Sequence, residues 1–124
     1  MKSGPEPTYR LVVAEDLHSV GWEQLKAAAD IEVAGPFGCQ DELIGALANA
    51  DGLLICSETK VDASLLAAGP RLKVIARAGA RLDNVDIDQA TRRGILVIHV
   101  PDANLTAMVE YVFLLMLALA RNWG

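Results

Sequence analysis

The sequence predicts an α/β fold, in which a five-stranded parallel, flavodoxin-like sheet of order 2-1-3-4-5 carries helices on both faces. Three observations lead to this prediction. Short apolar runs alternate with helix-forming segments, which is the pattern of repeated β-α-β units. The 124 residues suffice for one domain, and 52% of them are hydrophobic. Only 5% are aromatic, so the core is aliphatic, which suits a parallel sheet buried on both faces.

The strands are predicted from short aliphatic runs separated by turn-forming or helix-forming residues. These runs lie at residues 10–14, 31–34, 52–56, 73–76 and 95–98. Residues 1–8 contain two prolines and a glycine without periodicity, so we expect a flexible lead-in there. Residues 9–103 then form the domain, and residues 104–124 form a separate helical segment. For five strands in such units, 2-1-3-4-5 is the natural order.

The first two helices are predicted at residues 21–29 and 40–49. In the first, Trp22 and Leu25 are spaced to face the sheet. The second opens with two acidic residues, which stabilise a helix N-terminus.

The next two helices have clearer ends. Residues 62–68 follow Asp62 as N-cap and stop at the Gly69-Pro70 pair. Residues 86–93 begin with Asp86 as N-cap, have two arginines in the last turn, and are followed by a glycine. This pattern makes the fourth helix the most clearly delimited of the chain.

A long final helix is predicted from Asn104 to Arg121, and it is apolar on nearly every face. Its apolar side chains are those of Leu105, Val109, Val112, Phe113, Leu115, Met116, Leu117 and Leu119. One face can lie on the sheet, and the other should meet another domain or another chain. Each such side chain left in water costs roughly 1.5–3 kcal/mol. We therefore expect a homo-oligomer, or docking through this helix.

Composition excludes several classes of function. The formal net charge of −5, with scattered basic residues, disfavours nucleic-acid binding. The longest apolar run, residues 111–120, is too short for a bilayer, and the N-terminus lacks the apolar segment of a signal peptide. Cys39 and Cys56 have no metal-binding or redox spacing, which favours reduced thiols, no metal and a cytoplasmic location.

Ligands of such sheets bind outside the carboxyl ends of the strands. Four loops lie there, and their chemically capable residues are Glu15, Asp16 and His18, then Ser57, Glu58, Thr59 and Lys60, then Arg77 to Arg81, and last His99, Pro101, Asp102 and Asn104. Backbone amides near Gly79, the Ser57 and Thr59 hydroxyls, and a charge from Lys60 or Arg77 could receive an anion.

Simpler roles compete with ligand binding at these residues. Ser57 and Thr59 can cap the following helix, Gly79 can simply permit a turn, and Lys60 can be solvated surface. His99 has no carboxylate beside it in the sequence, so a structural hydrogen bond is the better interpretation. His18 is expected at the surface, and no partner can be named for Glu110.

The segment between Asp51 and Asn122, above all PRLKVIARAGARLDN and VDIDQATRRGILVIHVP, resembles the D-2-hydroxyacid dehydrogenase family, and within it the D-3-phosphoglycerate dehydrogenases. The resemblance implies the substrate-binding domain, in which the loops at Ser57 and at Gly79-Ala80 hold the substrate carboxylate or phosphate. The ligand implied is a small anionic hydroxy- or keto-acid. Substrate-contacting residues implied in this way, or by the physical argument above, are Ser57, Arg77, Gly79, Ala80, Arg81 and Asn104.

Family members use NAD, but this chain has no G-x-G-x-x-G for pyrophosphate. The resemblance thus implies NAD for the full-length family and no cofactor, catalytic residue or activity in this chain alone. Three departures stand out: Arg81 replaces a loop glycine, Cys56 replaces an arginine that contacts phosphate, and Asp102 follows His99-Val100-Pro101 in place of glycine.

Two other interpretations remain. The chain can be a stand-alone, non-catalytic ligand-binding or assembly module derived from the family. A phosphorylatable receiver domain shares the fold, and Glu15-Asp16 fits its acidic pair. However, its third strand should end in aspartate, and here the strand ends at Cys56-Ser57.

Overall fold

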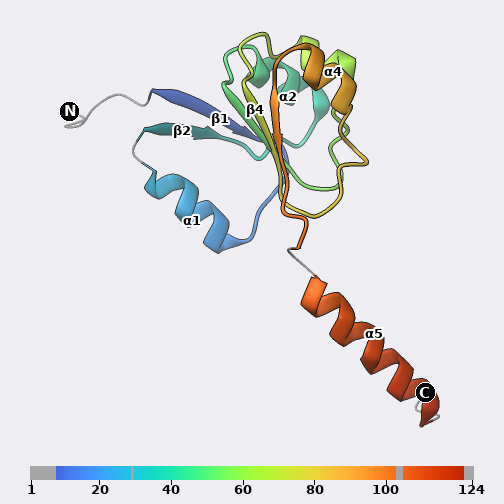
Figure 1. Cartoon of the computed structure of the whole chain (residues 1–124). Helices are drawn as coiled ribbons and strands as arrows, with labels where there is room; N and C mark the ends of the chain where they lie inside the picture. The colour runs from blue at the N-terminus through green and yellow to red at the C-terminus, as the bar shows by residue number, and fades with distance from the viewer. Residues whose placement is uncertain (1–7, 29, 103–104, 122–124) are drawn as a thin grey trace.

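The computed structural model describes residues 8–28, 30–102 and 105–121 and confirms the predicted topology. A five-stranded parallel sheet has the order β2-β1-β3-β4-β5 (Figure 1). The strands are β1 (Tyr9–Val13), β2 (Ile31–Ala34), β3 (Gly52–Ile55), β4 (Val74–Arg77) and β5 (Leu96–Ile98). The helices are α1 (Ser19–Ala27), α2 (Gln40–Leu47), α3 (Ala63–Ala67), α4 (Ile87–Arg92) and α5 (Leu105–Ala120).

The predicted helix caps are present. Asp62 accepts a hydrogen bond from the Leu65 amide at the start of α3, and Asp86 does the same for the Gln89 amide at the start of α4. Gly94 follows α4 with φ of 68°, a left-handed conformation that favours glycine. The start of α1 was predicted two residues too late, because the His18 side chain caps the Val20 amide.

One face of the sheet carries the hydrophobic core. Val12, Leu53, Ile55 and Ile75 point to this face, and none of them is more than 1% exposed. They belong to one cluster with buried side chains of the covering helices, which are Leu43 and Leu47 of α2, Leu65 and Leu66 of α3, and Ala90 of α4. Most of the burial in the molecule therefore lies on the side of α2, α3 and α4.

The opposite face is covered only in part. Helix α1 lies on that side, near β1 and β2, and buries none of its side chains fully (Figure 1). Trp22 and Leu25 are half-buried, in keeping with the predicted orientation. Over β3, β4 and β5 the burial alternates with period two, and the side chains on this face are half-buried or exposed. We call this surface, made by Leu54, Val74, Ala76, Leu96 and Ile98, the open face.

Helix α5 extends away from the sheet (Figure 1). Of the two positions left open by the sequence, on the sheet or against another domain or chain, this helix does not take the first. Nine of its large apolar side chains are between 44% and 79% exposed. Within the described ranges, no helix is both long and apolar enough to cross a membrane.

Candidate functional site

The loops that follow β1, β3, β4 and β5 meet at the carboxyl edge of the sheet, as the parallel topology requires. Side chains from distant parts of the sequence join these loops. The contacts centre on residues 56–59, the loop after β3, which contains Ser57. We call residues 56–59 the serine loop.

Glu15, just beyond β1, fixes the serine loop through its backbone amides. Its carboxylate accepts hydrogen bonds from the amide of Cys56 and from that of Glu58, the latter at 2.7 Å. These amides lie 41 and 43 residues further along the chain. Because an internal carboxylate already occupies them, an anionic ligand must use other donors of this loop, such as the exposed Ser57 hydroxyl.

Arg77, the last residue of β4, holds the same loop through a side-chain hydrogen bond to its backbone. Its side chain is 9% exposed, and its Nε donates to the Cys56 carbonyl at 3.2 Å. Its guanidinium also lies 3.8 Å from the Asp83 carboxylate. The cation predicted to meet a ligand is thus largely engaged in positioning the serine loop.

Asn84 also holds the serine loop, and the sequence argument assigned it no role. Its side-chain amide donates to the carbonyls of Cys56 and Thr59, at 2.9 and 2.7 Å. The Asn84 Oδ1 atom is buried and has no hydrogen-bond partner among the described residues. Such loop-to-loop bonds join residues 25 to 28 positions apart, so sequence spacing gives no sign of them.

The absence of a side chain at Gly79 leaves room for the Arg77 guanidinium. A Cβ at this position would lie 3.0 Å from the Arg77 Nη1 atom, tighter than ordinary van der Waals contact. The Gly79 amide donates to the Arg77 carbonyl at 2.9 Å. Among the hydrogen bonds of the described residues, none uses the Ala80 or Arg81 amide as donor. The neighbouring amides, rather than that of Gly79, are therefore open to a ligand.

His99 has the structural role favoured by the sequence argument. Its Nδ1 atom lies 2.9 Å from the Ala80 carbonyl, and the adjacent Val100 amide donates to the Gly79 carbonyl at 2.9 Å. The end of β5 thereby fixes the loop after β4. His18 is exposed at the start of α1, as expected.

Acidic and basic side chains lie in different parts of this edge. Arg81 is 79% exposed and pairs with Asp83 at 3.3 Å, so its charge is directed toward solvent beside Arg77. Glu15 and Glu58 place negative charge on the opposite side of the serine loop. An anion is therefore favoured on the side of Arg77, Ala80 and Arg81.

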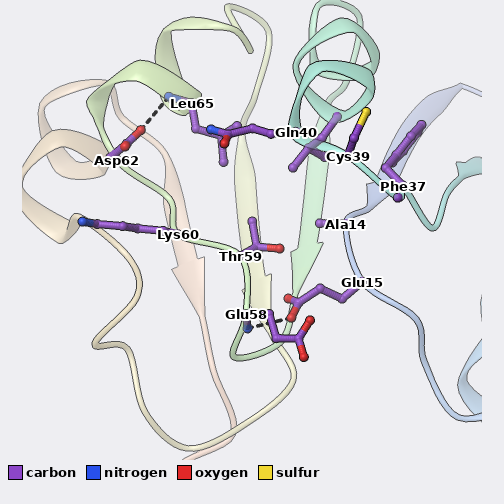
Figure 2. A pocket seen from close by; sticks show the side chains of 12 residues that line it. Ala14, Glu15, Phe37, Cys39, Gln40, Glu58, Thr59, Lys60, Asp62 and Leu65 are labelled. Atoms are coloured by element: carbon purple, nitrogen blue, oxygen red, sulfur yellow. Dashed lines mark hydrogen bonds between the residues drawn. The ribbon is translucent and has the colours of Figure 1, made fainter.

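A pocket near these loops lies on the acidic side; its lining includes Thr59 and Lys60 but none of the six residues predicted to contact substrate. It is a cavity of about 380 Å³ between the serine loop and the start of α2. In Figure 2 the Glu15 and Glu58 side chains lie together at one end, and Lys60 points away from them. The sequence argument missed its wall formed by Phe37, Gly38, Cys39 and Gln40. With Glu15, Glu58 and Asp62 in its lining, this cavity suits an anionic ligand poorly.

Cys56 is a weak nucleophile in this setting. Burial raises the pKa of its thiol above the ordinary value of 9.0, the negative charge of Glu15 raises it further, and Arg77 opposes the shift. Both cysteines are free thiols. No group of three or more His, Cys, Asp or Glu side chains in the described ranges is arranged to hold a metal ion.

The structure thus gathers five of the six residues predicted to contact substrate. Ser57, Gly79, Ala80 and Arg81 lie on adjoining loops, and Arg77 lies beneath them. The sixth, Asn104, lies outside the described residues. Neither Ser57 nor Thr59 caps α3, because Asp62 performs that task. The positioning roles of Glu15 and Asn84 were not foreseen.

The chain matches a known protein family. The sequence model described as "D-isomer specific 2-hydroxyacid dehydrogenase, catalytic domain" matches residues 11–121. The match therefore begins well before Asp51, the first residue of the segment that resembles the family by its sequence motifs. The D-3-phosphoglycerate dehydrogenase of Mycobacterium tuberculosis is 50% identical over 83 residues, which are 67% of this chain and 16% of that protein. The hydroxypyruvate reductase of Thermotoga maritima is 38% identical over 114 residues, 92% of this chain and 37% of that protein.

Solved structures show the same architecture. A protein of Thermus thermophilus superposes with a TM-score of 0.79 at 32% identity, covering 91% of this chain and 37% of its own. The NAD⁺-bound 3-phosphoglycerate dehydrogenase of Entamoeba histolytica superposes with a TM-score of 0.74 at 24% identity, covering 90% and 39%. At that identity the second likeness concerns the fold alone. The chain spans well under half the length of each of these proteins.

Proposed function

We propose that this chain, which belongs to the D-isomer specific 2-hydroxyacid dehydrogenase family, is the substrate-binding domain of an NAD-dependent dehydrogenase and is not catalytically competent alone. Residues 9–103 form the domain in this proposal, and residues 104–124 lead toward a nucleotide-binding domain. The relatives named D-3-phosphoglycerate dehydrogenase and hydroxypyruvate reductase both match only part of their length to this chain. Both names point to a small acid as ligand.

One observation supports the proposal: Ser57 and residues 79–81 lie in the loops that follow the adjacent strands β3 and β4, at the carboxyl edge of the sheet. There the Ser57 hydroxyl and the amides of Ala80 and Arg81 can donate to a carboxylate, and the Arg81 guanidinium adds charge. Arg77 acts from below as a positioning residue through the Cys56 carbonyl. Asn104 completes the set by family resemblance.

NAD does not fit the residues present here. The pyrophosphate of a dinucleotide needs a glycine-rich turn that opens a helix, and the sequence has no G-x-G-x-x-G. When bound, NAD would accept the hydride removed from a hydroxyacid. In this proposal the cofactor is held by residues outside this chain, and the chain's own part is to bind and orient the acid.

The substrate class follows from the charges at the edge. Both arginines pair with Asp83, but the Arg77 side chain is largely buried, so Arg81 is the cation of this loop that faces solvent. Because Cys56 supplies no charge where related enzymes have an arginine, we propose a monocarboxylate D-2-hydroxyacid or its keto-acid over a phosphorylated one. Phosphoglycerate would need a second cation.

A titration followed by NMR tests this proposal. D-Lactate, D-glycerate and D-3-phosphoglycerate are added to the isotope-labelled chain at millimolar concentrations. We expect shifts at the amides of Ser57, Ala80 and Arg81 that saturate and disappear in Ser57→Ala, whereas Ser64→Ala, an exposed serine of α3, leaves them unchanged. Shifts confined to the cavity residues around Phe37, or none with any acid, would refute the assignment.

A stand-alone, non-catalytic ligand-binding or assembly module is the second candidate. Cys56, Arg81 and Asp102 favour it, because these departures from the family pattern lie in the loops that catalysis would constrain. We propose association through α5 with another domain or another copy in either case. The intact mass of the native protein separates the candidates: a mass far above 13.2 kDa supports the dehydrogenase, and 13.2 kDa supports the module.

A further inference from the structure

Ser57 lies between two backbone amides that are already occupied. Glu15 accepts hydrogen bonds from the Cys56 amide and from the Glu58 amide, so its carboxylate holds the loop on both sides of Ser57. Among the hydrogen bonds of the described residues, none uses the Ser57 amide as donor. Thr59 lines the acidic cavity instead. The amide and the exposed hydroxyl of Ser57 are therefore the donors that the centre of the serine loop can offer to a ligand.

The occupied amides are those that an external anion would otherwise use. Neighbouring backbone N–H groups of a loop form a concavity that binds anions. In the serine loop the anion is the internal carboxylate of Glu15, at 2.7 Å from the Glu58 amide. A phosphate group presents three acceptor oxygens, whereas the amide and hydroxyl of Ser57 match the two oxygens of one carboxylate. The loop is thus equipped for a carboxylate rather than for a phosphate.

The charge of Glu15 acts close to Ser57. Glu15 is half-buried, and none of the ion pairs among the described residues includes it. Lys60 points away from it in Figure 2. Burial raises the pKa of the Cys56 thiol, and the negative charge of Glu15 raises it further, with Arg77 opposing. Because this charge is felt at the residue next to Ser57, it also repels negative charge on a ligand held by Ser57.

We propose that Glu15 is a specificity-determining residue of the acid site, which leaves Ser57 the donors for one carboxylate and repels a second negative charge on the ligand. The inference rests on the function proposed above and deepens it by naming the residue that sets the charge of the substrate. Two unit charges about 8 Å apart, at an effective dielectric constant of about 40, repel each other enough to weaken binding about fivefold. Removal of the Glu15 charge improves the binding of a doubly charged acid, relative to a singly charged one, by about that factor.

The test compares two acids of the same shape. D-Malate carries two negative charges at neutral pH, and its 4-amide, in which a carboxamide replaces the distal carboxylate, carries one. NMR titration of the Ser57 and Ala80 amides measures the dissociation constant of each acid for the wild type and for Glu15→Gln. We expect the ratio of the malate constant to the amide constant to fall about fivefold in Glu15→Gln. The Arg81 charge is the same in both proteins, so the change in this ratio isolates the charge of Glu15.

Two further variants separate the charge of Glu15 from its hold on the loop. Glu15→Asp keeps the charge on a side chain one methylene shorter, so it should weaken the binding of both acids alike and leave the ratio unchanged. Glu23→Gln removes the charge of an exposed glutamate on α1 and should also leave the ratio unchanged. The amide resonances of buried residues such as Ile75 show whether each variant is folded.

An unchanged ratio in Glu15→Gln overturns the inference, because a merely structural residue changes both affinities together. An equal fall of the ratio in Glu15→Asp or in Glu23→Gln overturns it as well. In the wild type itself, D-malate that binds more tightly than its amide has the same consequence, so the test does not depend on the folding of one variant. Binding of both acids with an unchanged ratio refutes this inference alone, whereas no binding of either acid or of D-lactate refutes the proposed function and this inference with it.

Discussion

Removing the Glu15 carboxylate should destabilise the domain, because this side chain joins the end of β1 to the serine loop. It accepts from two backbone amides, those of Cys56 and Glu58. A hydrogen bond to a charged acceptor contributes about 1.5–3 kcal/mol to stability. Its removal costs more where the amide left without an acceptor is shielded from water. The Cys56 amide belongs to a half-buried residue and the Glu58 amide to an exposed one, so only the first should carry the full loss.

Glu15→Ala should therefore lower the free energy of unfolding by about 2–3 kcal/mol. Glu15→Gln keeps an acceptor without the charge and should cost about half as much. Urea unfolding at one fixed protein concentration measures these differences, since a dimer makes stability depend on concentration. Glu23→Ala is the matched control, because Glu23 is an exposed glutamate of α1.

A local readout completes this test. In Glu15→Ala the amides of Cys56 and Glu58 should exchange hydrogen with solvent faster. The exchange rates of core amides, such as that of Ile75, should change only as far as the global stability of the domain changes. A Glu15→Ala protein within about 0.5 kcal/mol of the wild type, the usual range for exposed surface changes, would show that the serine loop does not depend on this carboxylate.

Three further predictions concern the same loops. Gly79→Ala should displace the Arg77 guanidinium and cost about 1–2 kcal/mol in urea unfolding, because the added Cβ would lie 3.0 Å from Nη1; an unchanged stability would mean the arginine moves freely. Asn84→Asp should destabilise more than Asn84→Ala, because a carboxylate would face two carbonyl oxygens, and equal thermal midpoints for the two variants would refute this. The Cys56 thiol should react with iodoacetamide slowly until the pH passes its raised pKa, because only the thiolate reacts. Glu15→Gln should lower that pKa and speed the reaction at pH 8. A rate unaffected by the substitution would contradict the assigned role of the Glu15 charge.

The strands and their order could be predicted from the sequence because each depends on local information. Aliphatic runs of four or five residues between capped helices are visible in one dimension, and the hand of β-α-β units leaves few arrangements of five strands. The caps at Asp62 and Asp86 need only the next three residues, and both occur where the sequence predicts them. The start of α1 was missed because histidine at His18 is an uncommon cap.

The site was predicted less completely, because its contacts join residues far apart in sequence. The rule that ligands bind at the carboxyl ends of parallel strands selects candidate loops without identifying what each side chain does there. From the sequence, Arg77 could equally be a cation that contacts a ligand or a residue that holds the loop. Its hydrogen bond to the Cys56 carbonyl favours the second role. In the sequence Glu15 resembles a surface acid, although it accepts hydrogen bonds from two of the four amides of the serine loop.

The position of α5 shows the limit of pattern reasoning most clearly. A helix that is apolar on all sides has no preferred face, so periodicity cannot state which surface it covers. The open face carries the complementary information: alternate residues of β3, β4 and β5 are apolar and yet exposed.

The open face and the candidate site also share a strand. Ile98 belongs to the open face, and the next residue, His99, contacts the Ala80 carbonyl in the loop after β4. Because neighbouring strand residues point to opposite sides, an element seated on Ile98 lies one residue from a contact that fixes the loop after β4. Covering the open face would hold the end of β5 in place and, through His99, the amides of Ala80 and Arg81.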